Sequence, residues 1–309
     1  MSLGEMTAGE MTVGRVGAID HEVTDVWQPK RRIKWGTIGR HVVLIALCLW
    51  VLLPLAWVLL LSVKSLPDGT QRYLWPHNFV DPIYAHYKFV IEKATAAVVS
   101  FKNSVLVTTL TVVASTITAV LAAYALVHLK TPFRAVVTAL LVASLFFPTR
   151  VTALLGIYNI QDRLGLINVT WSLMLPYTAL TVAISVFIMR GVFETVPKEL
   201  LDSARVDGAN SARILAGIML PLVRNGIVVV IIVNFVAAWG EYLLALTLMN
   251  DAAKRTLPVF IANSSGGVGA FLWPRIAALY IIAILPALIT FGIAQRWFMK
   301  GLQEGALKA

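Results

Sequence analysis

Polar side chains inside apolar segments are the first candidates for chemistry here, because such groups are costly in a bilayer and are usually functional. Glu241, in the run FVAAWGEYLL, is the one acid that clearly lies within such a segment. Its carboxylate could reach the outer surface between Trp239 and Tyr242, two aromatic residues typical of a membrane interface. It could instead line a pathway and hydrogen-bond a polar solute. Asn234, about two helical turns away, could line the same pathway, but a hydrogen bond to a neighbouring helix is favoured.

Motifs of several enzyme classes are missing from the sequence. No GxxxxGK followed by Ser or Thr occurs, so the chain has no P-loop to hold a nucleoside triphosphate. The five histidines are scattered and no two are three or four residues apart, which disfavours a metal site. No GxSxG segment is present, and the single cysteine, Cys48, lies in an apolar run. We therefore expect no catalytic residue, no metal and no cofactor bound by this chain.

Membrane-spanning helices are the elements that must position these side chains. The chain has 309 residues, of which 58% are hydrophobic and 14% charged, whereas soluble domains carry about a quarter charged residues. Its mean hydropathy is +0.79. Six runs contain the roughly 17–25 mainly apolar residues that a helix needs to cross a bilayer. They cover about 41–63, 104–128, 135–157, 171–193, 224–246 and 276–298. We predict an all-α integral membrane protein whose six-span domain occupies residues 41–298.

Basic residues assign the two sides of the membrane. Sixteen Lys and Arg residues lie in the tails and loops that share a side with both termini, against ten in the other loops. The cluster KRRIK at 30–34 adds weight beside the first span, so the positive-inside rule places both termini in the cytoplasm. The segments expected inside are the tails 1–40 and 299–309 and the loop 194–222. Those expected outside are Lys64–Asn103 and Asp251–Trp273, the latter with a flexible Gly/Ser loop. A short interfacial helix ended by Gly165 is expected within Ile157–Asn168.

The loop 194–222 contains the signals of two short helices that meet at a sharp corner. Pro197 suits a first helical turn, with Thr195 as a possible cap. Gly208 supplies the left-handed position that ends the first helix. Asn210 or Ser211 can cap a second helix, which continues until the chain returns to the membrane.

The surfaces of this loop distinguish two interpretations. Leu200, Leu201, Ala204 and Val206 form an apolar-to-small surface of the first helix, and Ile214, Leu215, Ile218 and Met219 are expected to face the bundle. Small residues at the corner (Ser203, Ala204, Ala209) would let another surface approach closely. A helix lying on lipid headgroups would explain the amphipathic pattern only. An interface for a cytoplasmic partner also explains the glycine corner with its flanking small and acidic residues.

The segment PKELLDSARVDGANSARILAGIMLPL resembles the EAA loop of ATP-binding-cassette importer permeases. The family triplet corresponds here to Asp202, Ser203 and Ala204, and the following glycine motif to Asp207, Gly208 and Ala209. Asp for Glu and Ser for Ala are mild departures. The segments FKNSVLVTTL, AAYALVHLKTPFR, GLINVTWSLMLPY, FIMRGVFETVPKEL, WGEYL and RWFMKGLQEGALKA are similar to the carbohydrate, maltose-type branch, in particular its smaller six-span subunit. Gly240 replaces the usual Asn of that branch.

This resemblance implies a type I importer fold with a cytoplasmic coupling helix, and a bacterial or archaeal cell membrane as location. The chain would be the permease subunit of an ATP-driven, binding-protein-dependent importer of a sugar or oligosaccharide. Its partners would be a second homologous permease, two cytoplasmic ATPases that use ATP and Mg, and an outer solute-binding protein, with no nucleic acid. The residues that would couple to the ATPase are Glu199, Asp202, Ser203, Ala204, Asp207, Gly208 and Ala209. Those assigned to the substrate pathway are Asn234, Trp239, Glu241 and Tyr242. Those facing the binding protein are Asn263, Ser264, Ser265, Gly266 and Gly267.

Three alternatives to a sugar importer stay open at this point. A six-span secondary carrier would need coupling-ion groups near the middle of the membrane, and the lack of central acids disfavours it. A sensor or assembly factor would need only the lipid-facing interpretation of the loop. An importer of the same type could carry a glycerol phosphate or a polyol.

Overall fold

The computed structural model describes residues 35–65, 75, 80–88, 90–91, 95–129, 131–146, 152–265 and 273–306. The chain divides into two units, Met1–Val51 and Leu52–Ala309. Most of the predicted N-terminal tail therefore lies outside the described residues. The described part of the first unit is the beginning of α1 (Trp35–Ser62), an apolar helix whose residues 39–51 are exposed.

The described residues form helices and contain no strand, as predicted for an all-α protein. After α1 the helices are α2 (Val80–Lys88), α3 (Thr95–His128), α4 (Arg134–Phe146), α6 (Leu154–Arg163), the 3-10 turn η3 (Thr170–Leu173), α7 (Met174–Glu194), α8 (Lys198–Val206), α9 (Ser211–Ile214), the π-helical segment η4 (Leu215–Met219), α10 (Leu220–Leu222), α11 (Arg224–Trp239), α12 (Leu243–Leu248), the 3-10 turn η5 (Ala252–Lys254), α13 (Leu257–Ser265) and α14 (Trp273–Ala306).

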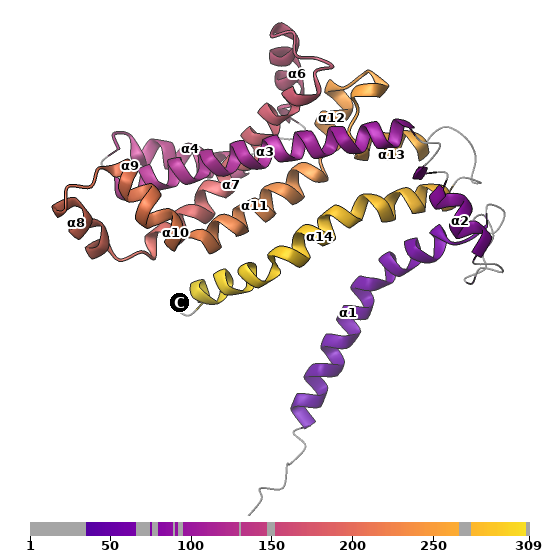
Figure 1. Cartoon of the computed structure of the whole chain (residues 1–309), viewed down its shortest axis with the longest axis horizontal. Coiled ribbons are helices and arrows are strands. Elements are labelled where there is room, and N and C mark those ends of the chain that lie inside the picture. The colour runs from indigo at the N-terminus through magenta and orange to yellow at the C-terminus, as the bar shows by residue number, and fades with distance from the viewer. Residues whose placement is uncertain are drawn as a thin grey trace, which may run out of the picture. The chain divides into compact units, whose positions relative to one another are not determined.

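The centre of the second unit is α3, which packs against α7 and α11, while α14 packs against α11 (Figure 1). Small residues recur every three or four positions on the buried face of α3, which lets the neighbouring helices approach closely. This face comprises Ser100, Ser104, Thr108, Thr111, Ser115, Ala119 and Ala123. Two buried hydrogen bonds of 2.8 Å cross the interior, Ser115 to Thr181 and the Ser185 hydroxyl to Asn234 Oδ1. Polar groups thus help to fix the helix pairs.

Within the described residues, four helices are long and apolar enough to cross a membrane, namely Gly39–Ser62, Thr95–His128, Thr170–Glu194 and Trp273–Gln295. The pair Ser211–Leu222 and Arg224–Trp239 is bent by 80° and makes a fifth if it is counted as one span. In the expected span 135–157, α4 has 13 residues, or about 20 Å at 1.5 Å per residue. The region from Leu154 onward belongs to α6 instead. The count of six spans therefore stays a prediction.

Several boundaries differ from those expected. The helix that contains the second expected span begins at Thr95, before residue 104, and the last helix continues through Ala306, so residues 299–306 of the expected tail are helical. The fifth expected span, 224–246, is divided: α11 ends at Trp239, residues 240–242 are not helical, and α12 begins at Leu243. Local apolar composition does not reveal such a break.

Candidate functional site

The first helix of the loop, α8, begins after Pro197, whose ψ of 135° places it outside the helix as the N-cap. The expected cap by Thr195 is wrong. Thr195 is the C-cap of α7, and its hydroxyl donates to the Val192 carbonyl at 2.8 Å. Glu199 lies in the first turn of α8, where the partial positive charge of a helix N-terminus favours an acid.

The corner after α8 has the predicted glycine geometry. Gly208 has φ +78°, the left-handed region that favours glycine. Its N–H donates to the Arg205 carbonyl at 3.0 Å, and the Ala209 N–H donates to the Ala204 carbonyl at 2.9 Å. These two bonds are those of a Schellman motif, which satisfies the carbonyl groups at the end of the helix. The prediction of a glycine-ended helix is confirmed.

The second helix of the loop is capped by Asn210, whose side-chain oxygen accepts the Arg213 N–H at 2.8 Å. Ile214 and Met219 are fully buried against the bundle, and Leu215 and Ile218 pack on the same cluster, as predicted. A π-helical segment, Leu215–Met219, lies within this helix. The helical path then bends by 80° into α11.

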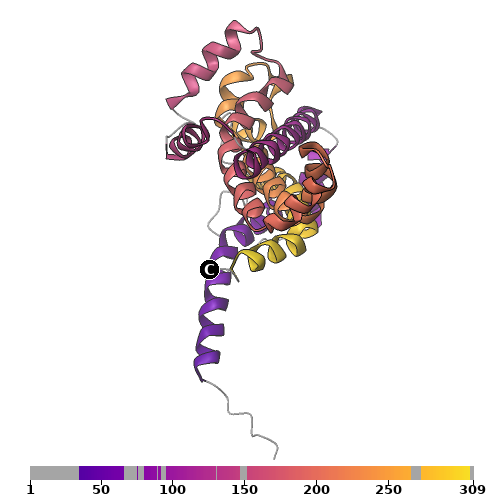
Figure 2. The ribbon, with the colours of Figure 1, turned by 90° about the vertical axis from the view of Figure 1, so that its left-hand side faces the viewer.

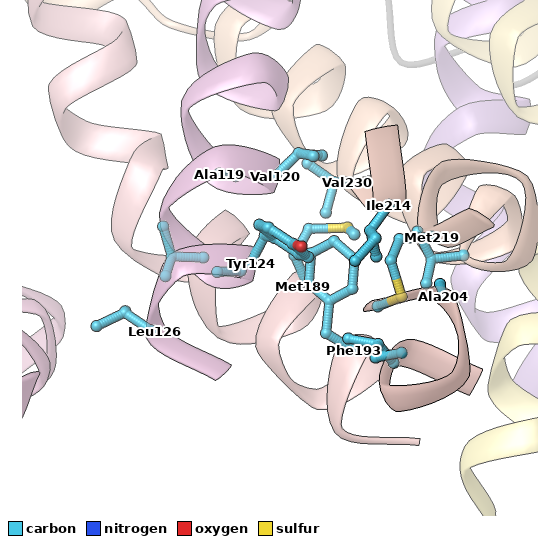
Figure 3. Packing of buried hydrophobic residues seen from close by; sticks show 14 residues of the cluster. Ala119, Val120, Tyr124, Leu126, Met189, Phe193, Ala204, Ile214, Met219 and Val230 are labelled. Atoms are coloured by element: carbon cyan, nitrogen blue, oxygen red, sulfur yellow. The ribbon is translucent and has the colours of Figure 1, made fainter. Parts of the chain in front are cut away.

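A buried cluster holds the corner on the ends of α3 and α7 (Figure 3). Tyr124, Met189 and Phe193 lie together with Ile214 and Met219 in this cluster. The Tyr124 and Phe193 rings meet edge to face, with centroids 6.0 Å apart. The corner is therefore packed as part of the bundle rather than attached as a free loop.

Two hydrogen bonds join the corner to the end of α3. The Tyr124 hydroxyl donates to the Ser211 carbonyl at 3.2 Å. The Arg205 guanidinium donates to the His128 carbonyl at 3.3 Å and also pairs with Asp202 at 2.9 Å. In each bond a side chain donates to a backbone carbonyl on the other side. The two bonds therefore hold the backbone of the corner against the end of α3.

The outward surface of the corner differs from the one expected. Glu199, Asp202, Ser203, Asp207 and Gly208 are exposed. Ala204 is 7% exposed and packs inward with Leu201, and Ala209 is half-buried, so the expectation that Ala204 receives another surface is wrong. Val206 is 87% exposed and Leu200 44%. Val206 and Leu200 are thus the apolar groups that the corner presents outward, between acidic and basic neighbours.

Glu241 is 6% exposed, so its carboxylate does not reach the surface of this chain. Its two oxygens accept the N–H groups of Leu244 at 3.0 Å and Ala245 at 3.2 Å. These N–H groups begin α12 and have no partner within their own helix. The acid after the α11 break therefore caps the next helix, a role that the sequence did not indicate.

The other three residues assigned to the substrate pathway lie on α11 or shortly after its end. Asn234 is fully buried and bonds Ser185 of α7, as its favoured interpretation predicted. Trp239 is 9% exposed, stacks on Phe235 and donates its indole N–H to the Ala283 carbonyl of α14 at 3.0 Å. Tyr242 is 38% exposed.

The segment expected to face a binding protein is helical where it is described. Asn263, Ser264 and Ser265 are the last residues of α13, and the Ser264 hydroxyl donates to the Phe260 carbonyl at 2.8 Å. The expectation of a flexible loop at these three positions is therefore wrong, because the apolar run from Leu257 continues as helix. Gly266 and Gly267 lie outside the described residues.

No cluster of three or more His, Cys, Asp or Glu side chains that could hold a metal ion occurs in the described part of the chain.

Comparisons with known proteins connect this arrangement to a family. Residues 115–304 match the model described as "Binding-protein-dependent transport system inner membrane component", and this range contains the loop 194–222. The chain is 34% identical over 259 residues to the sulfoquinovosyl glycerol transport system permease protein of Agrobacterium fabrum, covering 83% of this chain and 89% of that protein. It is 28% identical over 259 residues to the trehalose/maltose transport system permease protein of Thermococcus litoralis, with coverages of 83% and 91%.

A solved structure has a similar fold. It belongs to a bacterial ABC transporter involved in the import of the acidic polysaccharide alginate. The TM-score is 0.73 at 23% sequence identity, over 85% of this chain and 96% of that one.

Proposed function

The chain belongs to the family of binding-protein-dependent transport system inner membrane components, and from this membership we propose its cargo, its assembly and its coupling residues. It is a permease subunit of a binding-protein-dependent ABC importer. Such a permease works with an ATPase and with a binding protein. The single observation that carries the coupling proposal is the hydrogen-bonded, glycine-ended corner at Gly208.

The corner is the contact to the ATPase. Its outward face offers Val206 and Leu200 as apolar anchors, with Glu199, Asp202, Ser203 and Asp207 around them. Gly208 adds no side chain at the tip, while Ala204 and Ala209 pack the corner onto the bundle. A small apolar centre within a charged rim is typical of protein interfaces. ATP and Mg are used by two ATPase subunits, and this chain supplies no catalytic group.

A second, homologous permease completes the pore. Long apolar faces of α1, α4 and α14 are exposed in the single chain, and a lipid bilayer and a partner subunit would cover them. Both termini lie in the cytoplasm in this assembly, in line with the distribution of Lys and Arg. Asn263, Ser264 and Ser265 at the end of α13, and Gly266 and Gly267 after them in the sequence, face the binding protein on the other side.

The cargo is a sugar or oligosaccharide. Two relatives carry sulfoquinovosyl glycerol and trehalose/maltose in their names, which supports this class. Of the four residues assigned to the pathway, Tyr242 is partly exposed and offers its ring to the pathway, while Asn234, Trp239 and Glu241 support it through their contacts between helices. A glycerol phosphate or polyol is the alternative cargo, since the first of these relatives is named for a glycerol-containing compound.

Ligand identification on the associated binding protein tests the cargo. We expect its melting temperature to rise with one or more sugars or glycosides, because a ligand that binds only the native state stabilises it. The panel includes mono- and disaccharides, sugar glycerols, polyols and glycerol phosphates. Uptake of the stabilising compound should depend on this chain. If glycerol phosphate alone stabilised the binding protein, the proposed sugar cargo would be wrong and the alternative cargo would be supported.

A further inference from the structure

The beginning of α3 holds the segment that precedes α13. The Asn103 side-chain amide donates to the carbonyls of Ala253 and Arg255, both at 3.0 Å. The neighbouring Ser104 hydroxyl accepts the Leu257 N–H at 2.8 Å in a buried bond. That N–H begins α13 and has no intrahelical partner. Two adjacent residues of α3 therefore fix both η5 and the start of α13.

A third residue fixes the other end of this segment. Asn168 accepts the Asp251 N–H through its side-chain oxygen at 2.9 Å, and its own N–H donates to the Leu248 carbonyl at 3.0 Å. The segment 251–257 is thus held at both ends, with α3 providing the contacts closest to α13.

The opposite end of α3 holds the corner described above, through Tyr124 and the His128 carbonyl. Figure 1 shows α8–α10 at one end of α3 and α12 and α13 at the other, and Figure 2 views the bundle from the α8–α10 end. Asn103 and Tyr124 are separated by 21 residues, or roughly 32 Å of α-helix, about the thickness of the hydrocarbon core.

The helix between these contacts is suited to transmit a displacement. α3 is a continuous 34-residue helix without an internal proline or glycine, the common causes of kinks. Its buried face packs on α7 and α11 along much of its length. A rigid element with hydrogen bonds at both ends moves both ends together.

We propose that α3 mechanically joins the ATPase-contacting corner to the segment 251–265, with Asn103 as the positioning residue at the far end. This inference rests on the proposed function, because the corner must receive the ATPase. Movement of the corner on ATP binding then shifts η5 and α13 through Asn103 and Ser104. These residues transmit the response without touching nucleotide or solute.

The test uses the assembled complex, purified through a tag on this chain with its co-expressed permease and ATPase partners, and reconstituted in lipid. Cys48→Ser and Ala252→Cys together leave one thiol in this chain, at an exposed position of η5, and partner cysteines are replaced likewise. The rate of thiol modification by a membrane-impermeant maleimide is measured without nucleotide and with ATP plus vanadate. We expect nucleotide to change this rate by about five-fold or more.

Asn103→Asp keeps the side-chain size but removes both donated hydrogen bonds. We expect it to reduce the nucleotide effect on the thiol to less than about two-fold while basal ATP hydrolysis continues, since the corner is untouched. Val105→Ala, an exposed position two residues along α3, is the control and should keep the full effect. If the Asp variant does not assemble, Ser104→Ala serves the same test, because it removes only the acceptor for Leu257.

The outcomes separate the two proposals. A full nucleotide effect in the Asn103 variant, or no effect in the parent complex that hydrolyses ATP, overturns the role of α3 and leaves the ATPase contact standing. Failure of the parent chain to copurify with an ATPase overturns the proposed function and the role of α3 together.

Discussion

At the scale of single residues, the corner depends on side chains that point in opposite directions from one short helix. Leu201 and Ala204 are buried, whereas Val206 is 87% exposed. The Asp-Gly pair at 207–208 made the left-handed turn predictable, because few residues other than glycine adopt it readily. The directions of Ala204 and Val206 were not predictable, since they depend on how α8 rotates onto Tyr124 and Phe193.

Replacement of Val206 by Asp tests the apolar contact of the corner. Because this side chain is exposed, we expect the free energy of unfolding of the chain to change by less than about 0.5 kcal/mol. Loss of an interface anchor typically costs 1 kcal/mol or more, so ATPase retention should fall about ten-fold. The measurement is the amount of ATPase copurified per chain.

Leu164→Asp is the control for that substitution, because Leu164 is 62% exposed and lies directly before a left-handed glycine, as Val206 lies two residues before one. It should retain the ATPase. Equal retention by both variants would show that Val206 makes no contact in the complex.

At the scale of elements, local signals predicted the ends of short helices better than the course of long ones. Gly165, with φ +66°, ends α6 as expected, and Asn210 caps the second helix of the loop. The break between α11 and α12 was missed, because it depends on Glu241 reaching the free N–H groups of α12. That contact involves a buried acid, whose partners a linear pattern of apolar residues does not indicate.

Gly226 on α11 lies tightly against Val192 of α7. A Cβ at this position would lie 2.6 Å and 2.8 Å from the two methyl groups of Val192. The β-branched valine has little rotamer freedom in a helix, so it cannot move away cheaply. We expect Gly226→Ala to destabilise the protein by about 1–3 kcal/mol, and Val192→Ala to restore part of the loss.

Thermal unfolding in detergent measures this pair of effects. Gly292→Ala on α14 is the matched control, because no atom lies within 4 Å of its added Cβ. It should leave the melting temperature unchanged or raised. Additive effects of the changes at 226 and 192 would contradict the proposed contact.

The hydrogen bond between α2 and Lys64, which follows α1, should depend on pH. His86 is 3% exposed and its Nε2 lies 2.9 Å from the Lys64 carbonyl. Burial lowers the pKa of His86 below its usual 6.5, the hydrogen bond to Lys64 opposes this, and the charge of Arg275 lowers it further. As pH falls, His86 therefore becomes protonated at a higher pH in the unfolded chain than in the folded protein.

Stability from a neutral His86 is present above about pH 6.5 and is lost as pH falls through the lowered pKa of the folded state. We expect the melting temperature in detergent to drop between about pH 7.5 and 5.5. His86→Gln, which keeps a donor for the Lys64 carbonyl but does not titrate, should flatten this dependence. An unchanged slope in that variant would assign the pH response to another group.

At the scale of the whole molecule, apolar surface explains why the chain functions within an assembly. Composition alone indicated the membrane, and the order of short motifs indicated the family to which the chain belongs. The single chain exposes apolar residues along α1, α4 and α14, and α4 alone is short for a membrane crossing. How these helices are covered depends on contacts outside this chain, which no single sequence contains.

ATP hydrolysis by the reconstituted complex, stimulated by the solute-loaded binding protein, tests the coupling role of the corner most directly. We predict that Gly208→Asp abolishes this stimulation and solute uptake while membrane insertion stays normal, because a charged side chain is added at the tip of the corner. Gly165→Asp is the control, since that glycine also has positive φ and no atom within 4 Å of an added Cβ. Its strain, about 1–2 kcal/mol, should be similar, and it should keep stimulated hydrolysis. Normal stimulated hydrolysis in the Gly208 variant would contradict the coupling role of the corner.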